Sequence, residues 1–353
     1  MTTASNRFAI VAGATGQIGH SIANYLAAQN DWTVIGLARK PPLESSYPMI
    51  SVDLTDRADC VKKLSGLPGA THVIYAARFD HFGGAQESVE TNVSMLENLL
   101  NAILPTAINL AHIHLIHGTK YYGHTKALRP VPYHEDDPCG NFDSFYYGQQ
   151  ELVKRLQATQ LWNWTISRPH AFCDLNTDEP RNLLLLIGIY ASVMRACGQP
   201  LVFPGTEKAY QSRTQFSWLP ALARSVLWMM TSPQCANQAF NIVNGDAPTW
   251  SSLWLTIADY FDMPVGPAVS ASFEQLLADK DAVWQTLVKQ FGLRPSSLGQ
   301  VVQWPYGDYA LGVQWDVISD MARARSAGFT ETIDSHTMWR DGLDFYRSKK
   351  LIP

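Results

Sequence analysis

The sequence predicts an α/β protein: a doubly wound parallel sheet of the Rossmann type with a smaller, mostly helical C-terminal substrate or lid domain. Three observations support this prediction. Short apolar runs alternate with amphipathic stretches of helical period through the first half of the chain. A glycine-rich turn at residues 13–19 connects the first apolar run to the first amphipathic stretch. After Pro169 the alternation ends, and helical patterns with many aromatic residues follow.

The first half of the chain has the strand–helix alternation that a parallel sheet requires. Each expected strand is a short apolar or β-branched run, and each expected helix repeats apolar residues every three or four positions. The expected strands lie at residues 8–12, 33–38, 50–52, 71–76, 112–117 and 164–167, and the expected helices at 18–28, 89–103 and 145–157. Right-handed crossovers place the carboxyl ends of these strands at one edge of the sheet, so we expect ligands to bind there.

The second half of the chain is expected to build a further domain from discontinuous segments. Helices are expected over 181–197 and 250–261, and they flank an expected strand at 239–243 that returns to the main sheet. We therefore expect a nucleotide-binding domain over residues 1–170, rejoined by about 210–245. The remaining residues, 171–209 and 246–353, are expected to form a substrate-binding or lid domain.

Composition and charge exclude several classes of function. The chain has 353 residues, 46% of them hydrophobic, and a formal net charge of −4, so it lacks the basic excess that binds nucleic acid or an anionic membrane surface. The most apolar stretch, residues 183–193, is too short to cross a bilayer. The first residues lack the pattern of a signal peptide, and the five cysteines show no paired spacing. We expect a cytoplasmic protein with reduced thiols and without a metal site.

The glycine turn has the spacing of a dinucleotide-binding motif. Gly13 permits a tight turn, Gly16 lets the backbone approach a pyrophosphate, and Gly19 lets the following helix pack close to the strand. Because the turn lies between an expected strand and an expected helix, we prefer this interpretation to a glycine-rich connection without a ligand. The other cofactor contacts expected in the turn are Thr15, Gln17 and Ile18.

The residues after the second expected strand indicate NADP rather than NAD. An NAD-binding enzyme usually has an Asp or Glu about twenty residues after the glycine turn, where it binds the ribose hydroxyls. Here Arg39 and Lys40 occupy that place, and two cations favour the additional phosphate of NADP. The alternative is a solvated basic turn.

Further cofactor contacts are expected after the later strands. Asp53 and Leu54 follow the third expected strand, near the adenine, and the alternative role for Asp53 is the cap of the next helix. The remaining expected contacts are Ala76, Pro169 and His170, which follow the fourth and sixth expected strands.

The residues that ordinary short-chain dehydrogenases use for catalysis are rearranged in this sequence. Those enzymes have Tyr-x-x-x-Lys on one helix, where the lysine favours the ionised tyrosine, and a Ser or Thr from the preceding strand. Here Glu151 follows Tyr147 by four residues, and Gly118 occupies the place of the serine. A cation reappears as Lys120, after the fifth expected strand, whose end the fold brings to the start of the helix. The alternatives are a surface lysine and a half-buried core tyrosine, with Tyr146 as the rival of Tyr147.

These motifs give the chain a family resemblance. It resembles the progesterone 5β-reductase/iridoid synthase-like family of extended short-chain dehydrogenases/reductases in residues 36–42 (GLARKPP), 118–123 (GTKYYG) and 141–151 (NFDSFYYGQQE), and the likeness extends over nearly the whole chain. The resemblance implies that Tyr147 and Lys120 are catalytic and that NADPH reduces the C=C bond of a small-molecule enone or enal. Hydride would reach the β-carbon, and Tyr147, supported by Lys120, would stabilise the enolate oxygen. The resemblance is also compatible with a homodimer.

The sequence departs from the family pattern where a substrate pocket is expected. Two additional residues separate 141–142 from the tyrosine pair, Arg78 lies near a position where plant members have a Trp, and residues 124–129 are charged. Steroid and iridoid substrates are therefore not predicted. The candidate substrate contacts, each with core packing as its alternative, are Arg78, Tyr121, Phe145, Met194 and Phe329.

Three other functions are compatible with the sequence. An NADPH carbonyl reductase uses the same cofactor and tyrosine, and the sequence does not decide where the hydride goes. A nucleotide-sugar epimerase or dehydratase has the same fold but needs the missing serine and Tyr-x-x-x-Lys. A non-catalytic NADP sensor needs neither Tyr147 nor Lys120. The natural substrate, the stereochemistry of the product and the oligomeric state stay open.

Overall fold

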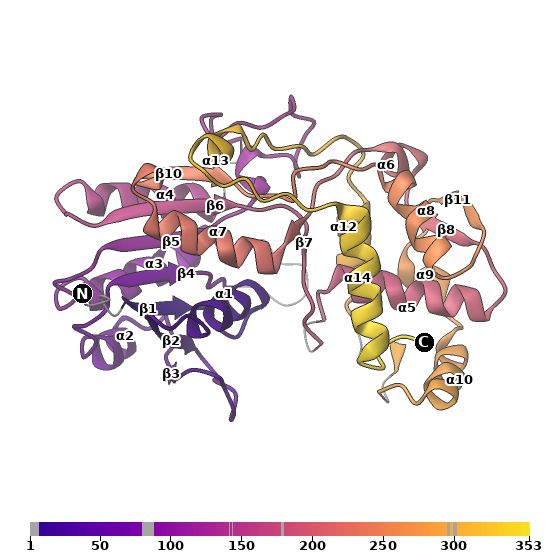
Figure 1. Cartoon of the computed structure of the whole chain (residues 1–353), viewed down its shortest axis with the longest axis horizontal. Coiled ribbons are helices and arrows are strands. Elements are labelled where there is room, and N and C mark those ends of the chain that lie inside the picture. The colour runs from indigo at the N-terminus through magenta and orange to yellow at the C-terminus, as the bar shows by residue number, and fades with distance from the viewer. Residues whose placement is uncertain are drawn as a thin grey trace.

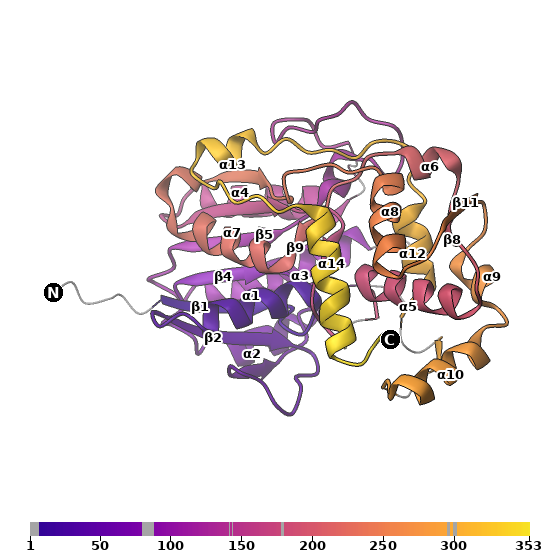
Figure 2. The same cartoon turned by 45° about the vertical axis from the view of Figure 1, so that its right-hand side comes forward.

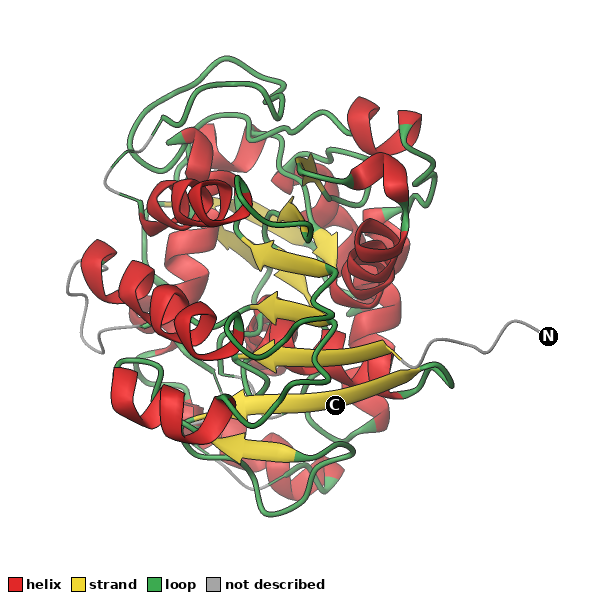
Figure 3. Cartoon of the chain, turned by 90° about the vertical axis from the view of Figure 1, so that its left-hand side faces the viewer, coloured by secondary structure: helices red, strands yellow, loops and turns green. Residues whose placement is uncertain are grey.

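The computed structural model describes residues 7–79, 88–140, 142, 144–177, 180–294, 297–298 and 302–353. In this part of the chain a seven-stranded parallel sheet confirms the predicted Rossmann fold. From one edge to the other its strands are β10 (Gln238–Asn241), β6 (Asn163–Arg168), β5 (His112–Ile116), β4 (His72–Tyr75), β1 (Arg7–Ala12), β2 (Trp32–Ala38) and β3 (Met49–Ser51). Figure 3 shows helices on both faces of the sheet.

The strands form where the sequence has short apolar runs. The last four residues of β1 are fully buried, because β1 lies in the middle of the sheet and both of its faces are covered. The strand expected over 239–243 forms as β10, and it pairs in parallel with β6 at the sheet edge, from Gln238 opposite Thr165 to Asn241 opposite Arg168. A segment from late in the chain therefore completes the sheet, as the sequence predicts.

Two layers of helices cover the sheet. Helices α1 (Gln17–Ala27) and α7 (Leu219–Thr231) pack together on one face, and α2 (Arg57–Leu64), α3 (Val89–Ile103) and α4 (Phe145–Gln157) pack side by side on the other. Helices α3 and α4 have the predicted bounds because a serine caps each N-terminus. The hydroxyl oxygens of Ser88 and Ser144 accept hydrogen bonds from the backbone N–H groups of Thr91 and Tyr146. Helix α7 was not predicted, although Pro220 in its first turn is a helix-start signal.

A second, mostly helical body lies beside the sheet body (Figure 1). Its core surrounds α5 (Leu183–Ala196), in which residues 183–194 are all buried, as expected for the most apolar stretch of the sequence. The small parallel pair of β8 (Leu201–Pro204) and β11 (Val265–Val269) was not predicted, because strands this short carry little periodic signal. The elements are α5 (Leu183–Ala196), β8 (Leu201–Pro204), α6 (Glu207–Gln211), α8 (Trp250–Tyr260), β11 (Val265–Val269), α9 (Phe273–Leu277), α10 (Asp281–Phe291), α12 (Trp304–Leu311) and α14 (Ser335–Ser348).

The chain passes between the two bodies more than once. The short parallel pair of β7 (Phe172–Cys173) and β9 (Ser217–Trp218) lies where it leaves the sheet body and where it returns. In Figure 1 and Figure 2, α14 lies on the side of the helical body that faces the sheet body. None of the helices in the described ranges is both long and apolar enough to cross a membrane.

Candidate active site

The glycine turn forms the junction between β1 and α1. Gly13 has a left-handed φ of +79°, and a β-carbon there would lie 2.7 Å from the backbone of Ala76 at the end of β4. A β-carbon on Gly19 would overlap the carbonyl oxygen of Gly13, so α1 packs directly against the turn. Helix α1 begins at Gln17 with Gly16 as its N-cap, which has no side chain to occupy the first backbone N–H groups. The turn therefore has the space and the donors that a pyrophosphate requires.

The loop after β2 is held against the glycine turn. Tyr47 is buried, and its hydroxyl donates a hydrogen bond to the carbonyl oxygen of Ala14 (3.2 Å), while the Ser46 hydroxyl donates to α1. Burial also raises the pKa of Tyr47, which keeps this donor protonated. Arg39 and Lys40 lead into the loop and are exposed at the end of β2. The end of β2, which leads into Arg39 and Lys40, also lies at the turn, because the carbonyl oxygen of Leu37 accepts hydrogen bonds from the N–H groups of Gly13 and Ala14. No sequence pattern singled out Tyr47.

The residues after β3 and β4 lie at the same edge of the sheet. The carboxylate of Asp53 accepts hydrogen bonds from the backbone N–H and the hydroxyl of Thr55, at 2.9 and 2.7 Å. The alternative role of Asp53 as the cap of the next helix is wrong, because the N-cap of α2 is Asp56. Asp53 closes an Asx turn instead. The side chain of Leu54 is buried in the core, whereas that of Arg78 is exposed.

Lys120 lies in η1 (Thr119–Tyr122), a single 3-10 turn directly after β5. The N–H of Thr119 donates to the carbonyl oxygen of Pro169 (3.2 Å), so the chain ends of β5 and β6 are tied together. Gly123 ends the turn with a φ of +79°, where a β-carbon would overlap the backbone of Gly140. Lys120 is half-buried, and its ammonium nitrogen lies 5.4 Å from the ring centre of Tyr309 in α12. The helical body therefore borders the sheet edge at this lysine.

Tyr147 comes from the first turn of α4. Its side chain is half-buried, and the ring of Phe142 meets it edge to face with 5.3 Å between the ring centres. Glu151, at the position where ordinary short-chain dehydrogenases have their lysine, is 47% exposed and forms an ion pair with Lys154 at 3.3 Å. Helix α4 therefore has no lysine four residues after Tyr147, and the pairing of Tyr147 with Lys120 of η1 stays a prediction.

Three further aromatic side chains belong to η1 and to the first turn of α4. Tyr146 stacks on the ring of His117, with 4.7 Å between centres and 25° between planes. Phe145 and Tyr121 are only 3% and 5% exposed, so both pack in the interior, which is the alternative role that the sequence analysis gave them. Their direct contact with a substrate stays a prediction.

Arg168, at the end of β6, is the residue that sequence reasoning missed. It is 1% exposed, and its guanidinium donates hydrogen bonds to the hydroxyl of Tyr122 (3.0 Å), the carbonyl oxygen of Glu135 (3.1 Å) and the side-chain oxygen of Gln150 (3.0 Å). The guanidinium carbon also lies 3.6 Å from the ring centre of Tyr121. Because Tyr122 is in η1 and Gln150 in α4, this one side chain joins the segment that carries the lysine to the helix that carries the tyrosine pair. The only sequence signal was an arginine at the carboxyl end of a buried strand.

A second set of buried polar groups supports the Arg168 network. The Tyr122 hydroxyl donates to the side-chain oxygen of Asn241 in β10 (2.7 Å), and the backbone N–H of Asn241 donates to the Glu135 carboxylate (2.8 Å). Burial raises the pKa of Tyr122 to about 12 and also raises the pKa of the Glu135 carboxyl. The hydroxyl of Tyr122 is therefore a fixed, protonated link between η1 and the edge strand.

His170 connects η1 to the segment that returns from the helical body. Its Nδ1 lies 2.6 Å from the hydroxyl oxygen of Thr119 and its Nε2 lies 3.4 Å from that of Thr214. Burial, together with the neighbouring His124, lowers the pKa of His170 well below its usual value, so the ring is neutral at pH 7. Both ring nitrogens are engaged within the protein, and contact of His170 or Pro169 with a cofactor stays a prediction.

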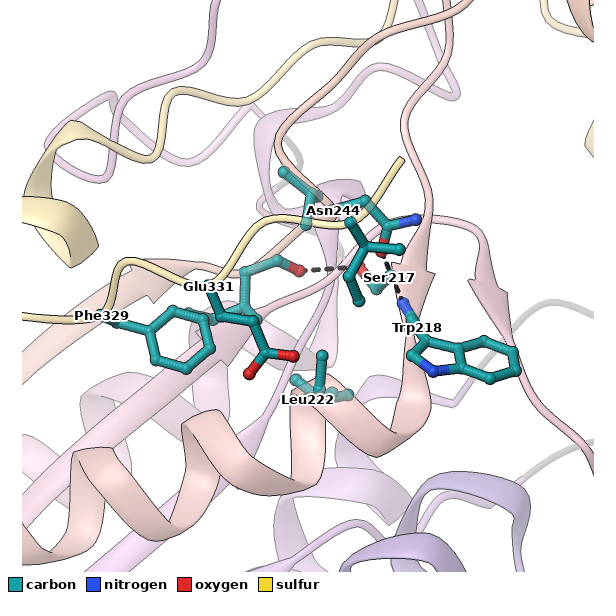
Figure 4. A pocket seen from close by; sticks show the side chains of 10 residues that line it. Ser217, Trp218, Leu222, Asn244, Phe329 and Glu331 are labelled. Atoms are coloured by element: carbon teal, nitrogen blue, oxygen red, sulfur yellow. Dashed lines mark hydrogen bonds between the residues drawn. The ribbon is translucent and has the colours of Figure 1, made fainter. Parts of the chain in front are cut away.

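Two of the candidate substrate residues lie in separate cores. Met194 is 3% exposed inside the α5 core, and Phe329 is 9% exposed and packs on Trp228 of α7, with 5.2 Å between ring centres. Figure 4 shows Phe329, Leu222 and Asn244 among the residues that line a small pocket. The volume of this pocket is about 10 Å³, room for no more than one water molecule. The structure does not bring these two side chains together with Tyr147, because both complete the packing of other layers.

Comparison with known proteins decides the family. The family model described as the PRISE-like Rossmann-fold domain matches residues 53–353. The chain belongs to the PRISE-like Rossmann-fold family. This PRISE-like protein is 30% identical to a 3-oxo-Δ4,5-steroid 5β-reductase of Arabidopsis thaliana over 362 residues, which cover 98% of this chain and 93% of the relative. It is also 30% identical to an (S)-8-oxocitronellyl enol synthase of Nepeta cataria, with the same coverage. A short chain dehydrogenase of Penicillium aethiopicum is 28% identical, with 98% and 99% of the two chains covered.

Solved structures agree on the fold of this PRISE-like protein. A short-chain dehydrogenase/reductase superfamily protein of Agrobacterium tumefaciens with bound NAD has a TM-score of 0.68 at 14% identity, covering 97% of this chain and 98% of that one. The Pseudomonas aeruginosa protein RMD, complexed with NADPH, has a TM-score of 0.66 at 15% identity, with 99% and 100% covered. The PRISE-like protein therefore has the extended short-chain dehydrogenase/reductase fold, and the predicted family resemblance is confirmed.

Proposed function

We propose that this protein is an oxidoreductase that uses NADPH to reduce the C=C bond of activated enones or enals by 1,4-addition. One observation supports this more than any other. The cation of the site, Lys120, comes from η1, while the tyrosine comes from α4 and no serine stands at Gly118. This set of groups suits stabilisation of an enolate oxygen better than the proton relay of a carbonyl–alcohol interconversion. The named activities of the steroid 5β-reductase and the oxocitronellyl enol synthase support the same reaction class.

The cofactor would be held by residues at the carboxyl edge of the sheet. The backbone of the glycine turn and the first N–H groups of α1 fit the pyrophosphate, and Arg39 and Lys40 fit the 2′-phosphate of NADP. Two structures with this fold contain NAD or NADPH, which supports a nicotinamide cofactor without deciding between the two. When bound, the reduced cofactor supplies a hydride to the β-carbon of the substrate.

The protein's own side chains would act on the substrate oxygen. The Tyr147 hydroxyl donates a hydrogen bond to this oxygen as negative charge develops on it, and the Lys120 ammonium lowers the free energy of that charge. Lys120 is half-buried beside the Tyr309 ring, where a charge interacts more strongly than it does in bulk water. The α-carbon then takes a proton from solvent, so the protein needs no further general acid.

The substrate is proposed as a class only. Arg78, an exposed cation after β4, lies at the edge where the pocket is expected, and it favours polar or small enones and enals over a steroid. We also propose that the helical body binds the substrate or acts as its lid, with the domain bounds given above. A homodimer and a cytoplasmic location remain proposals, and light scattering after gel filtration tests the first.

The test of this function follows NADPH consumption with 2-cyclohexen-1-one and an acyclic enal, and identifies the product by mass spectrometry and NMR. We expect the saturated carbonyl compound as the product, and a fall in kcat of about 10²- to 10³-fold for Tyr147→Phe and for Lys120→Ala. Lys154→Ala changes a lysine of α4 that is 46% exposed and is the control, with kcat within twofold of wild type. An alcohol as the only product would show a carbonyl reductase instead.

The cofactor preference has a separate test. Arg39→Asp removes a cation and adds a carboxylate, so the affinity for NADPH should fall about 10- to 100-fold while that for NADH is kept or rises. Arg57→Asp, at the exposed start of α2, is the control for a general change of charge. Fluorescence titration with each cofactor measures both, and an unchanged ratio would contradict the NADPH proposal.

A further inference from the structure

Tyr146 has an unusual position for a side chain next to the proposed catalytic tyrosine. Its ring contacts two aromatic neighbours: the ring of His117 stacks on it, and the ring of Phe145 meets it edge-on at 65°, with 4.5 Å between the centres. These contacts direct its hydroxyl at the end of β5, the edge at which the fold binds ligands. A β-carbon built on Gly118 would lie 3.6 Å from the Tyr146 hydroxyl oxygen.

Gly118 occupies the place where ordinary short-chain dehydrogenases have their catalytic serine, so the Tyr146 hydroxyl lies beside the place of a missing hydroxyl. Its backbone is extended, with φ −175° and ψ 172°, a conformation that any residue adopts, so glycine is not required there by the backbone. A side chain at this position would stand beside the Tyr146 hydroxyl and the carbonyl oxygen of Pro169, the latter 3.5 Å from the β-carbon. Position 118 therefore contributes no side-chain polar group, and the hydroxyl beside this position comes from Tyr146 of α4.

A substrate oxygen that becomes an enolate has more than one lone pair to satisfy. Tyr147 alone donates one hydrogen bond, and in a site partly closed to water each additional fixed donor lowers the free energy of the developing charge. We propose that Tyr146 is a second catalytic hydroxyl, which donates a hydrogen bond to the same substrate oxygen while it keeps its proton. This proposal rests on the enone reduction proposed above, and it assigns the oxygen to a site with two phenolic donors.

The decisive variants keep the aromatic packing and move only the hydroxyl. Tyr146→Phe retains the ring between His117 and Phe145 and removes one oxygen atom. Gly118→Ser, combined with Tyr146→Phe, puts a hydroxyl back beside the place of the lost one, and the ordinary contact distances at Gly118 leave room for its β-carbon. Gly118→Ser alone shows the effect of the serine itself.

Two measurements are made on each variant. The first is kcat and KM for 2-cyclohexen-1-one with NADPH. The second is equilibrium binding of 4-nitrophenol in the presence of NADP⁺, followed by the absorbance of its phenolate, which imitates an enolate oxygen and needs no turnover. We expect Tyr146→Phe to lower kcat about 10- to 100-fold with KM within threefold, and to weaken phenolate binding about tenfold or more. The double variant should recover at least part of both losses.

The outcomes separate this proposal from the proposed function. A kcat within twofold of wild type, or an unchanged affinity for the phenolate, in Tyr146→Phe overturns the role of Tyr146. Loss of both kcat and phenolate binding with no recovery in the double variant overturns it as well, because a hydroxyl supplied from position 118 then does not replace the one removed from Tyr146. If the wild-type protein reduces no enone, the proposed function fails, and phenolate binding still shows whether the two hydroxyls form an oxyanion site.

Discussion

Arg168 offers the sharpest test of how the proposed site is held together. Arg168→Met keeps an unbranched side chain of similar reach and removes the guanidinium. Three hydrogen bonds at 3.0 to 3.1 Å are lost, and the side-chain oxygen of Gln150 and the carbonyl oxygen of Glu135 lose a buried donor. The stacking of the guanidinium on the Tyr121 ring is lost as well.

The cost of this change is estimated from the contacts. Hydrogen bonds from a charged donor contribute about 1.5–3 kcal/mol each to stability. The variant no longer has to bury a charge, which offsets part of this loss, so the free energy of unfolding should fall by about 3 kcal/mol. For a chain of 353 residues this lowers the thermal midpoint by about 4 °C. Because η1 and α4 lose their link, kcat should also fall, by as much as about 100-fold for a displacement near 1 Å.

The assay combines thermal unfolding by circular dichroism with enone reduction and NADPH fluorescence titration. NADPH binding should change less than kcat, because β5 and β4 lie between β6, which ends at Arg168, and β1, which leads into the glycine turn. Arg155→Met is the matched control: its side chain is 70% exposed, with one ion pair to Glu97 at 3.4 Å, worth less than about 1 kcal/mol. A midpoint within 1 °C of wild type together with an unchanged kcat would refute the reasoning about Arg168.

Two further predictions concern the glycine turn and the buried histidines. Gly13→Ala should destabilise the protein by more than about 1 kcal/mol, because φ is +79° and the added carbon meets Ala76 at 2.7 Å. Gly16→Ala, with 3.4 Å from the added carbon to its nearest neighbour, should unfold like wild type but bind NADPH more weakly. Equal thermal midpoints for the two variants would contradict this. Burial lowers the pKa of His114 to about 3 from an unfolded value near 6.5, so its contribution to stability is full above pH 6.5 and falls by about 1.4 kcal/mol per pH unit below it. In urea unfolding, the free energy of unfolding of His114→Gln should therefore fall by about 2 kcal/mol less than that of wild type between pH 7 and pH 5. The same pH dependence in His114→Gln and wild type would count against the buried, neutral ring.

The fold was predictable because its signals are local. The glycine turn, the serine caps of α3 and α4 and the continuous apolar strands each lie within a few residues of the feature that they specify. The bounds of α3 and α4 follow from such caps. Helix α7 and the pair of β8 and β11 have weaker local signals, since one begins without a side-chain cap and the others span four and five residues. Their place depends on packing against elements far away in the chain.

The candidate site was less predictable because its supports are long-range. Tyr47 reaches the glycine turn over 33 residues, and Tyr122 reaches Asn241 over 119. No spacing rule relates such pairs, and a buried tyrosine looks the same in a sequence whether it packs or holds a turn in place. The same limit applies to Met194 and Phe329, whose apolar character fitted a pocket as well as a core, and which the structure places in cores.

The rearranged lysine explains why this site needs the Arg168 network. When a lysine follows a tyrosine by four residues on one helix, the helix itself fixes the distance between them. Here 27 positions separate Lys120 from Tyr147, and the intervening chain passes through Gly123, Gly140 and Glu135. Their relative position therefore depends on tertiary contacts: the close approach of the two glycine backbones, and the hydrogen bonds of Arg168 to η1, to residue 135 and to α4. Substitutions in this network should thus reduce kcat by more than their loss of stability explains. Substitutions in the α5 core that lower stability by the same amount should leave the kcat of the folded protein unchanged.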